Sequence, residues 1–558
     1  MIPWIVLLLL IVVYCITLPT LLKRAGVKNS VLGYIPIAQF IPFLRAIKRP
    51  WWWIILLLVP GVNLIMLVII NVELGISFNK RSTLEQWKFG ALPWYALPHL
   101  AFQDKEAAFV GPRDWTGKKK STIREWSEAI VFAVVAASVI RSFFIEAFTI
   151  PTGSMENSML VGDYLFVSKV SYGAKLPQTP MSVPFVHNAL PGGMTNSYVD
   201  WFSLPYYRLP GLGKVERFDA VVFNFPNGDT ILVDPYYAGH NYHELLRNEA
   251  IHMAGVTNKV TTQEQAFNIY VKNREKYEGM ARNNFVVKQS CFSCGGMGRG
   301  VKVEGIRARP MDKKENYVKR CIGLPGENLE IRDRVVYING APIDTPAGAM
   351  FDYLINFSSS KSAKDILTEL EVAPGNIMPN WQKNWVTGMT MAVPLTAAGF
   401  EKIKTMSGID TIVVSNDSLV ENNMMSIFPN APMEPYNHWT RDNYGPIHIP
   451  AKGETIELTP ENIAVYKRTI TSYENNTWAE RDGAIIINGQ PATTYTFKQD
   501  YYWMMGDNRH HSADSRYWGW VPEDHVVGKP VFTWLSKNQP AHNGNSDFRF
   551  KRMFKTVK

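Results

Sequence analysis

A serine and a lysine in separate segments could together carry out nucleophilic chemistry. Ser154 lies in FTIPTGSM (148–155), where proline and glycine predict a stiff turn rather than a helix. Lys319 lies in YVKRCIGLPG (317–326), whose apolar residues predict a core strand. Because side chains alternate across a strand, Val318 and Lys319 face opposite sides, which places the lysine in or beside the apolar interior. A lysine amine has a pKa of about 10.4 in water, but burial disfavours its charge and allows the neutral amine to act as a base.

A third segment, MGDNRHHSADSR (505–516), is polar and contains Ser512. Taken alone, each of the three segments has an ordinary structural explanation: a turn, a lysine that extends from an edge strand into water, and a loop held by Asp–Arg pairs. His510 and His511 also lie in the third segment. Because adjacent strand positions point apart and no cysteine or carboxylate cluster accompanies them, we expect exposed loop histidines and not a metal site.

Motifs for other chemistries are missing from the sequence. There is no H-E-x-x-H, no Walker loop and no dinucleotide fingerprint, and the glycine cluster at 295–300 is expected to be a loop. Cys291 and Cys294 form a lone C-x-x-C, and zinc would need a second pair, whereas Cys321 stands alone. A disulfide outside the cytoplasm and two free thiols stay equally open. We expect no metal and no cofactor.

The composition separates an apolar first part from a more polar remainder. Of the 558 residues, 46% are hydrophobic and 19% charged, and the formal net charge is +9. A basic protein could bind nucleic acid or a membrane surface. The basic residues here lie beside apolar stretches and in the tail at 541–558, without the aromatic residues of a nucleic-acid groove. We therefore expect no nucleic-acid partner.

The elements that carry the three segments begin with a membrane region. Residues 2–22 are apolar for the length of a bilayer and lack both the basic start and the small-x-small exit of a cleavable signal. Residues 51–72 predict a second span with an aromatic belt. Residues 84–103, interrupted by two prolines and a lysine, predict a span or a re-entrant piece. A final span is expected at 126–147.

Positive charge sets the expected orientation of these spans. The loop at 23–50 carries six basic residues and no acid, and the loop at 104–125 carries Lys118, Lys119, Lys120 and Arg124. Both loops are therefore expected in the cytoplasm. Four spans with an outside N-terminus satisfy both loops, whereas three spans violate the first. Either arrangement delivers the chain after residue 147 to the outer face.

Beyond the membrane region, short apolar strands broken by glycine, proline and Asn-Gly turns predict mainly β structure. The hairpin-like segments VVYINGAPI (335–343) and AIIINGQPA (484–492) resemble each other, and each has an Asn-Gly typical of a type I′ turn. We expect a β core in two parts, 148–340 and 484–540. The core is expected to be interrupted by insertions at about 230–310 and at 341–483, the second with helices at 363–370 and 397–406.

Together and in order, the segments resemble bacterial type I signal peptidases, also called leader peptidases. The resemblance rests on five motifs: RSFFIEAFTIPTGSM (141–155), GDYLFVSK (162–169), RFDAVVF (217–223), YVKRCIGLPGE (317–327) and GDNRHHSADSRYWGWVP (506–522). It implies a mainly β catalytic domain of antiparallel sheets, with N-terminal transmembrane helices and α/β insertions.

The resemblance also implies residue roles. Ser154 would be the nucleophile, Lys319 its general base and Ser512 the hydroxyl that orients the lysine amine. The hydroxyl of Thr152 would join the backbone N–H of Ser154 in the oxyanion hole. The shallow substrate pocket would be lined by Phe148, Ile150, Met159 and Val318, and the site would be braced by Asp507, Asn508, Arg509, Asp514 and Arg516.

The function implied is a membrane-bound serine endopeptidase that removes signal peptides from exported preproteins after small-x-small sites, by acyl-enzyme chemistry. The implied partners are preprotein signal peptides, the lipid bilayer and the secretion translocon. The implied location is the bacterial plasma (inner) membrane, multi-pass, with the catalytic domain on the outer (periplasmic) face. Ser154 is followed by MENSM, where the family has proline, threonine and leucine, so the pocket near Met159 departs from the pattern.

Two other functions are compatible with parts of this pattern. A self-cleaving repressor of the serine–lysine type would share the fold, but such proteins are soluble and carry a DNA-binding module, whereas this chain has apolar spans. A catalytically inactive, membrane-tethered binding or scaffold module would keep the β fold. The presence of Ser154, Lys319 and Ser512 favours the peptidase.

Overall fold

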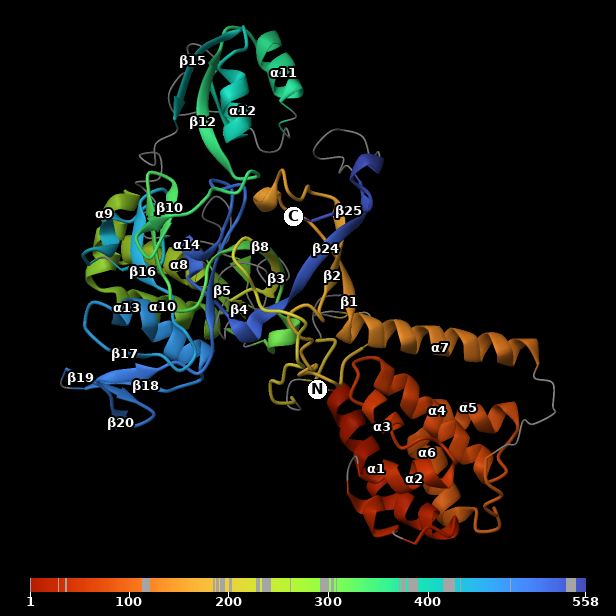
Figure 1. Ribbon diagram of the computed structural model, residues 1–558. Coiled ribbons are helices and arrows are strands. Elements are labelled where there is room, and N and C mark those ends of the chain that lie inside the picture. Colours follow the sequence, from red (N-terminus) through yellow and green to blue (C-terminus); the bar gives the residue numbers. More distant parts are fainter. Residues whose placement is uncertain are drawn as a thin grey trace. The chain divides into compact units, whose positions relative to one another are not determined.

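Contacts in the computed structural model divide the chain into two units, 1–144 with 175–207 and 145–174 with 208–558 (Figure 1). Each unit is described by itself. The described residues are 2–28, 30–35, 38–112, 121–183, 186, 190, 196–199, 203–226, 231–232, 242–260, 262–291, 301–302, 306–307, 309–370, 372, 378–379, 390–414, 427–431, 433–481, 483–537 and 548–557.

The first unit is helical and has its own apolar core. Residues such as Leu18, Phe43, Ile70 and Leu97 are fully buried in it. Its elements are α1 (Ile2–Arg24), η1 (Ser30–Tyr34), α2 (Phe40–Ala46), α3 (Trp53–Leu56), α4 (Val62–Ser77), α5 (Thr83–Ala91), α6 (Pro93–Pro98), η2 (His99–Gln103) and α7 (Thr122–Phe143).

Helix α7 is, within the described residues, the one helix long and apolar enough to cross a membrane. Its N-terminus is capped by the Ser121 hydroxyl, and its apolar stretch is not buried inside the unit. The stretch expected as a second span is divided into α3 and α4 around Pro60 and Gly61, because proline cannot donate the helical hydrogen bond. The stretch at 84–103 forms α5, α6 and η2 rather than one helix. The multi-pass arrangement stays a prediction.

The second unit is built on one antiparallel sheet that follows directly after α7. Its strand order is β1-β2-β24-β3-β8-β22-β23, and β25 pairs with β24. The strands are β1 (Ile145–Thr149), β2 (Asp163–Ser168), β3 (Ala220–Asn224), β8 (Asn316–Gly323), β22 (Tyr501–Met505), β23 (Val521–Pro522), β24 (Val526–Ser536) and β25 (Lys555–Thr556). The expected antiparallel sheets, combined with helices, are confirmed.

Two similar three-stranded hairpins occur in this unit. One is β9 (Asn328–Arg332), β10 (Val335–Ile338) and β11 (Ala341–Pro342), to which β16 (Tyr444–His448) adds a fourth strand; the other is β18 (Trp478–Arg481), β19 (Ala484–Ile487) and β20 (Gln490–Pro491). The Asn-Gly pairs at 339–340 and 488–489 have positive φ at all four residues, which confirms the predicted turns. The Asn339 and Asn488 side chains accept from the backbone N–H groups of Asn328 and Thr477, respectively.

Two further groups of elements have apolar cores of their own. A three-helix bundle consists of α8 (Tyr242–Asn258), α9 (Gln263–Lys272) and α10 (Arg274–Val286). A small α/β subdomain has the sheet order β13-β14-β12-β15, with strands β12 (Met350–Phe357), β13 (Met378–Pro379), β14 (Thr390–Thr396) and β15 (Ile409–Val414) and helices α11 (Ser360–Glu369) and α12 (Ala397–Ile403). In Figure 1 both helices lie beside this sheet, and their apolar residues share its core.

Cys291 is disulfide-bonded, whereas Cys15 and Cys321 are free; Cys294 lies outside the described residues.

Short elements complete the unit. The remaining elements are η3 (Gly153–Met155), β4 (Ile231–Leu232), β5 (Ser290–Cys291), β6 (Val301–Lys302), β7 (Ile306–Arg307), η5 (Met311–Lys313), η9 (Tyr436–His438), β17 (Thr455–Glu457), α13 (Ile463–Arg468), η10 (Thr469–Tyr473), β21 (Thr494–Thr496), α14 (Ser515–Trp518), η11 (Glu523–His525) and η12 (Phe550–Arg552).

Candidate active site

Ser154 and Lys319 meet at the centre of the second unit. Ser154 lies in the one-turn helix η3, directly after Pro151 has ended the extended segment of β1. Lys319 lies in β8, where it pairs with Val221 of β3. The Lys319 Nζ is 2.5 Å from the Ser154 Oγ, although the two residues are 165 positions apart in the chain. The amine also donates to the Val318 carbonyl at 3.1 Å.

The surroundings of Lys319 favour its neutral form. The residue is 3% exposed, and Ser154 is 9% exposed. Burial lowers the pKa of the Lys319 amine to about 8, against the opposing attraction of Asp514 and Asp507. A substantial fraction of the amine is therefore uncharged at slightly alkaline pH, and that form has a lone pair for the Ser154 proton.

Asn508 holds the serine turn in place. Its side-chain amide donates to the Gly153 carbonyl at 3.1 Å, and its backbone N–H donates to the Ser154 carbonyl at 3.1 Å. Because both bonds end on the turn that carries the hydroxyl, Asn508 fixes the backbone on either side of the Ser154 Cα. The role predicted for Asn508, bracing the site, stays a prediction.

Asp507 is paired with an arginine that the sequence analysis missed. Its fully buried carboxylate accepts from Arg320 Nε at 2.8 Å and from Arg320 Nη2 at 2.7 Å. The Ser158 hydroxyl donates to the same carboxylate at 2.5 Å. A signal was present, because Arg320 follows Lys319 in the core strand and a buried arginine requires an acid.

Asp514 and Arg516 form a second bidentate pair, with distances of 2.9 and 2.8 Å. Although burial opposes ionisation, Arg516 holds the pKa of the Asp514 carboxyl below its usual range. Arg509 is buried beside Arg516, and burial followed by this like charge lowers the pKa of Arg509 to about 10. Asp514 and Arg516 thus pair within the loop, whereas Asp507 pairs with Arg320 of β8.

Ser512 is buried beside the serine turn. A Cβ added to Gly506 would lie 2.2 Å from the Ser512 Oγ and 2.6 Å from the Ser154 carbonyl oxygen, so the three residues are in close contact. The two hydrogen bonds found for the Lys319 amine go to Ser154 and Val318. The lysine-orienting role of Ser512 and the oxyanion role of Thr152, which is exposed just before η3, stay predictions.

The four residues predicted to line the pocket belong to two adjoining apolar clusters. Ile150 and Met159 are buried in one cluster with Met155, Leu165 and Ala220, and Val318 packs against it. Phe148 packs with Val318 against the other cluster, which is formed by Val167, Val222 and Val527. Val318 packs against both clusters and therefore connects the other three predicted positions. It directly precedes Lys319 in the chain.

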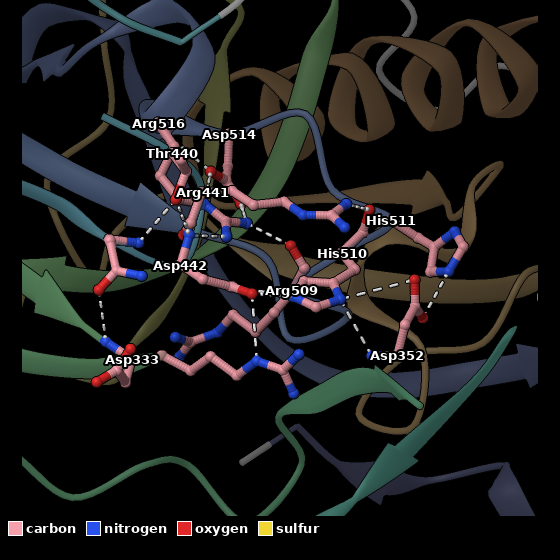
Figure 2. A network of polar contacts seen from close by, with 12 residues as sticks. Asp333, Asp352, Thr440, Arg441, Asp442, Arg509, His510, His511, Asp514 and Arg516 are labelled. Carbon is pink, nitrogen blue, oxygen red and sulfur yellow. Dashed lines mark hydrogen bonds and ion pairs between the residues drawn. The ribbon is translucent and has the colours of Figure 1, made fainter. Parts of the chain in front are cut away.

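The prediction of two exposed loop histidines is wrong for His510. Its side chain is fully buried and its Nε2 lies 2.9 Å from Asp442 Oδ1. His511 is half-buried, and its Nε2 lies 2.9 Å from Asp352 Oδ1. Figure 2 shows the His510 imidazole between Asp442 and Asp352, and the His511 imidazole beside Asp352. Within the described residues, no group of three or more histidine, cysteine, aspartate or glutamate side chains could hold a metal ion.

Comparison with known proteins places this chain in a family. The family model described as "Signal peptidase, peptidase S26" matches residues 123–378 and 448–535, which is more than half of the chain. The chain belongs to the signal peptidase I family. The signal peptidase match begins at residue 123, within α7. Earlier in the chain, residues 31–112 match a family of unknown function (DUF5684).

Curated signal peptidases I are similar over different lengths. The enzyme of Buchnera aphidicola subsp. Schizaphis graminum is 21% identical over 415 residues, 74% of this chain and 76% of that protein. That of Buchnera aphidicola subsp. Baizongia pistaciae is 22% identical over 75% of this chain and 80% of that protein. That of Haemophilus influenzae is 33% identical over 109 residues, which are 20% of this chain and 30% of that protein.

Proposed function

We propose that this chain is a membrane-anchored serine endopeptidase that removes signal peptides from exported preproteins. The observation that carries the proposal is the 2.5 Å distance between Ser154 Oγ and the buried Lys319 amine. A serine hydroxyl is a weak nucleophile unless a base takes its proton, and a buried neutral amine supplies that base. Membership of the signal peptidase I family supports the substrate class.

The proposed reaction has two stages. The Ser154 oxygen attacks the scissile carbonyl while its proton passes to Lys319 Nζ, and the resulting ammonium gives the proton to the leaving amine as the peptide bond breaks. The same amine then takes a proton from water as the water oxygen attacks the acyl ester, and it passes that proton to the Ser154 oxygen as the ester bond breaks. The backbone N–H of Ser154 and the Thr152 hydroxyl would stabilise the oxyanion, and loss of one such donor typically costs about 100- to 1000-fold in rate.

Small side chains would be selected by the apolar clusters around Val318. Ile150 and Met159 are buried with Met155, which follows Ser154, in the cluster against which Val318 packs. Phe148 packs with Val318 against the neighbouring cluster. This arrangement supports cleavage after small-x-small sites, with Ser512 orienting the amine of Lys319.

We further propose that the chain spans the bacterial plasma membrane several times with its catalytic unit on the periplasmic face, where signal peptides emerge from the secretion translocon. Helix α7 supports a membrane location, because it is long and apolar enough to cross a bilayer. It ends at Phe143, and β1 begins at Ile145. The serine turn is thus separated from the last span by the few residues of β1. The lipid bilayer and the translocon are the proposed partners.

The test uses the full chain purified in detergent with a preprotein that carries a small-x-small site. We expect cleavage at that site by the wild type and none by Ser154→Ala or Lys319→Ala. Both variants must keep the thermal unfolding midpoint within a few degrees of the wild type for the comparison to hold. Equal cleavage by both variants would favour the alternative function, an inactive scaffold, and attribute the activity to a contaminant.

A further inference from the structure

The loop that carries Asn508 and Ser512, here called the signature loop (506–516), is joined by backbone hydrogen bonds to the inserted segment at 341–483. The Met350 N–H donates to the Asp507 carbonyl at 2.8 Å, and the Arg509 N–H donates to the Met350 carbonyl at 2.9 Å. Met350 and Asn508 thereby form a parallel bridge. The first residues of β12 therefore lie along the loop that holds the serine turn.

His510 strengthens this junction from the loop side. Its Nδ1 accepts the backbone N–H of Asp352 at 3.1 Å, and its Nε2 lies 2.9 and 3.1 Å from the two carboxylate oxygens of Asp442. Because Nδ1 accepts a hydrogen bond, the proton of the neutral imidazole resides on Nε2 and is donated to Asp442. One buried side chain therefore connects the signature loop to two segments of the insertion, which are 90 positions apart and meet in Figure 2.

The charges around His510 are mutually compensated. His511 contacts Asp352, and Arg334 Nε donates to Asp442 at 3.2 Å. Although burial opposes ionisation, the neighbouring imidazoles of His510 and His511 hold the pKa of the Asp352 carboxyl below its usual range. The charged or titratable groups that surround the His510 side chain are Asp352 on β12, Asp442 and Arg441 before β16, Arg334 before β10, and Arg509, His511 and Arg516 on the signature loop.

The position of His510 in the loop connects this junction to the reacting groups. Asn508, two residues earlier, binds the serine turn through two hydrogen bonds. Ser512, two residues later, lies against Gly506 and the Ser154 backbone. A loop released from the insertion would therefore loosen both contacts with the serine turn, and water would reach the buried amine of Lys319.

We propose that His510 is a positioning residue whose imidazole fastens the signature loop to the inserted segment, so that the insertion helps to align Ser154 with Lys319. The inference rests on the proposed peptidase function. Both partners of His510, Asp352 and Asp442, lie in the segment 341–483 that is expected to interrupt the β core.

Three substitutions separate the two contacts of His510. His510→Asn keeps an acceptor near the Nδ1 position, His510→Gln keeps a donor near Nε2, and His510→Leu removes both. We expect kcat to fall with KM nearly unchanged, most strongly in His510→Leu, by about 100-fold, the typical cost of a small misplacement of reacting groups. The matched control is His448→Leu, since His448 binds Glu454 and Asn328 and contacts neither Asp352 nor Asp442.

A readout of the amine distinguishes positioning from simple loss of fold. Burial is the main cause of the low pKa of Lys319, so a loosened loop should raise that pKa from about 8 toward its ordinary value. We expect the midpoint of the kcat/KM–pH profile to move to higher pH in His510→Leu and to stay unchanged in His448→Leu. The same midpoint can be measured without activity, by trace labelling of Lys319 with acetic anhydride at a series of pH values.

Each outcome has one meaning. If the wild type cleaves the preprotein and the His510 variants keep its kcat and pH midpoint, the positioning role is wrong. If kcat falls only in proportion to the folded fraction and the midpoint does not move, His510 is structural and the inference is overturned. If the wild type does not cleave at all, the proposed function fails, while the labelling midpoint still decides whether His510 positions the loop.

Discussion

The guanidinium of Arg320 binds both carboxylate oxygens of Asp507, and both side chains are almost completely buried. Arg320 follows Lys319 in β8, and Asp507 precedes Asn508, which holds the serine turn. This ion pair therefore ties the strand of the lysine to the loop that fixes the serine. Its two halves are 187 positions apart in the chain.

Removing one half of this pair should destabilise the protein. Asp507→Asn leaves a buried guanidinium without its counter-charge, and breaking a buried pair in this way typically costs about 3–5 kcal/mol of unfolding free energy. Chemical denaturation of the purified full chain would measure the change in unfolding free energy. The control is Glu330→Gln, which breaks the exposed pair with Arg332 and should leave the unfolding midpoint nearly unchanged. Equal effects of the two substitutions would contradict the structural role of Asp507.

The cleavage rate should depend on pH through Lys319. The base must be neutral, so kcat/KM is expected to rise with pH and to level off above about 8, the lowered pKa of the buried amine. Initial rates measured from pH 6 to 10 with one preprotein would give the midpoint. A rate independent of pH across that range, or one that falls as pH rises, would exclude a titrating lysine base.

The same amine should limit stability. In the unfolded chain the lysine binds its proton up to about pH 10.4, whereas in the folded chain it releases the proton above about 8, so stability rises with pH between these values. At pH 7 the buried ammonium costs the fold at most about 3 kcal/mol, from this difference in pKa at about 1.4 kcal/mol per pH unit. Lys319→Met should therefore raise the thermal midpoint at pH 7 while it abolishes cleavage. A lower midpoint would show that the amine's contacts outweigh its desolvation.

Gly506 should tolerate no side chain. An alanine methyl group would meet the Ser512 Oγ and, at 2.6 Å, the backbone carbonyl of Ser154, which cannot move without displacing the serine turn. We expect Gly506→Ala to lower kcat by about 100-fold. Gly279→Ala in α10 is the matched control, because no atom lies within 4 Å of the added methyl group and a helical alanine is favourable. Full activity of Gly506→Ala would show that the loop adapts easily.

Several features followed from local sequence alone. The Asn-Gly pairs at 339–340 and 488–489 determine turns with positive φ, because asparagine and glycine tolerate the left-handed region that such turns require. Lys319 was assigned to a core strand from its apolar neighbours, and it is buried in β8. Pro151 and Gly153 likewise place Ser154 in a single 3-10 turn rather than in a longer helix. In each case the determining interactions lie within a few residues.

Other features depended on tertiary structure. The burial of His510 is decided by Asp352 and Asp442, 158 and 68 positions away, and no pattern around GDNRHHS indicates those partners. The pairing of Asp507 with Arg320 depends on the order β3-β8-β22, which brings the end of β22 beside β8. Sequence thus determined which residues could react, because turns and strands form through neighbouring residues. The tertiary structure decided which charges are compensated, because a buried ion is stable only where the folded chain supplies a distant partner.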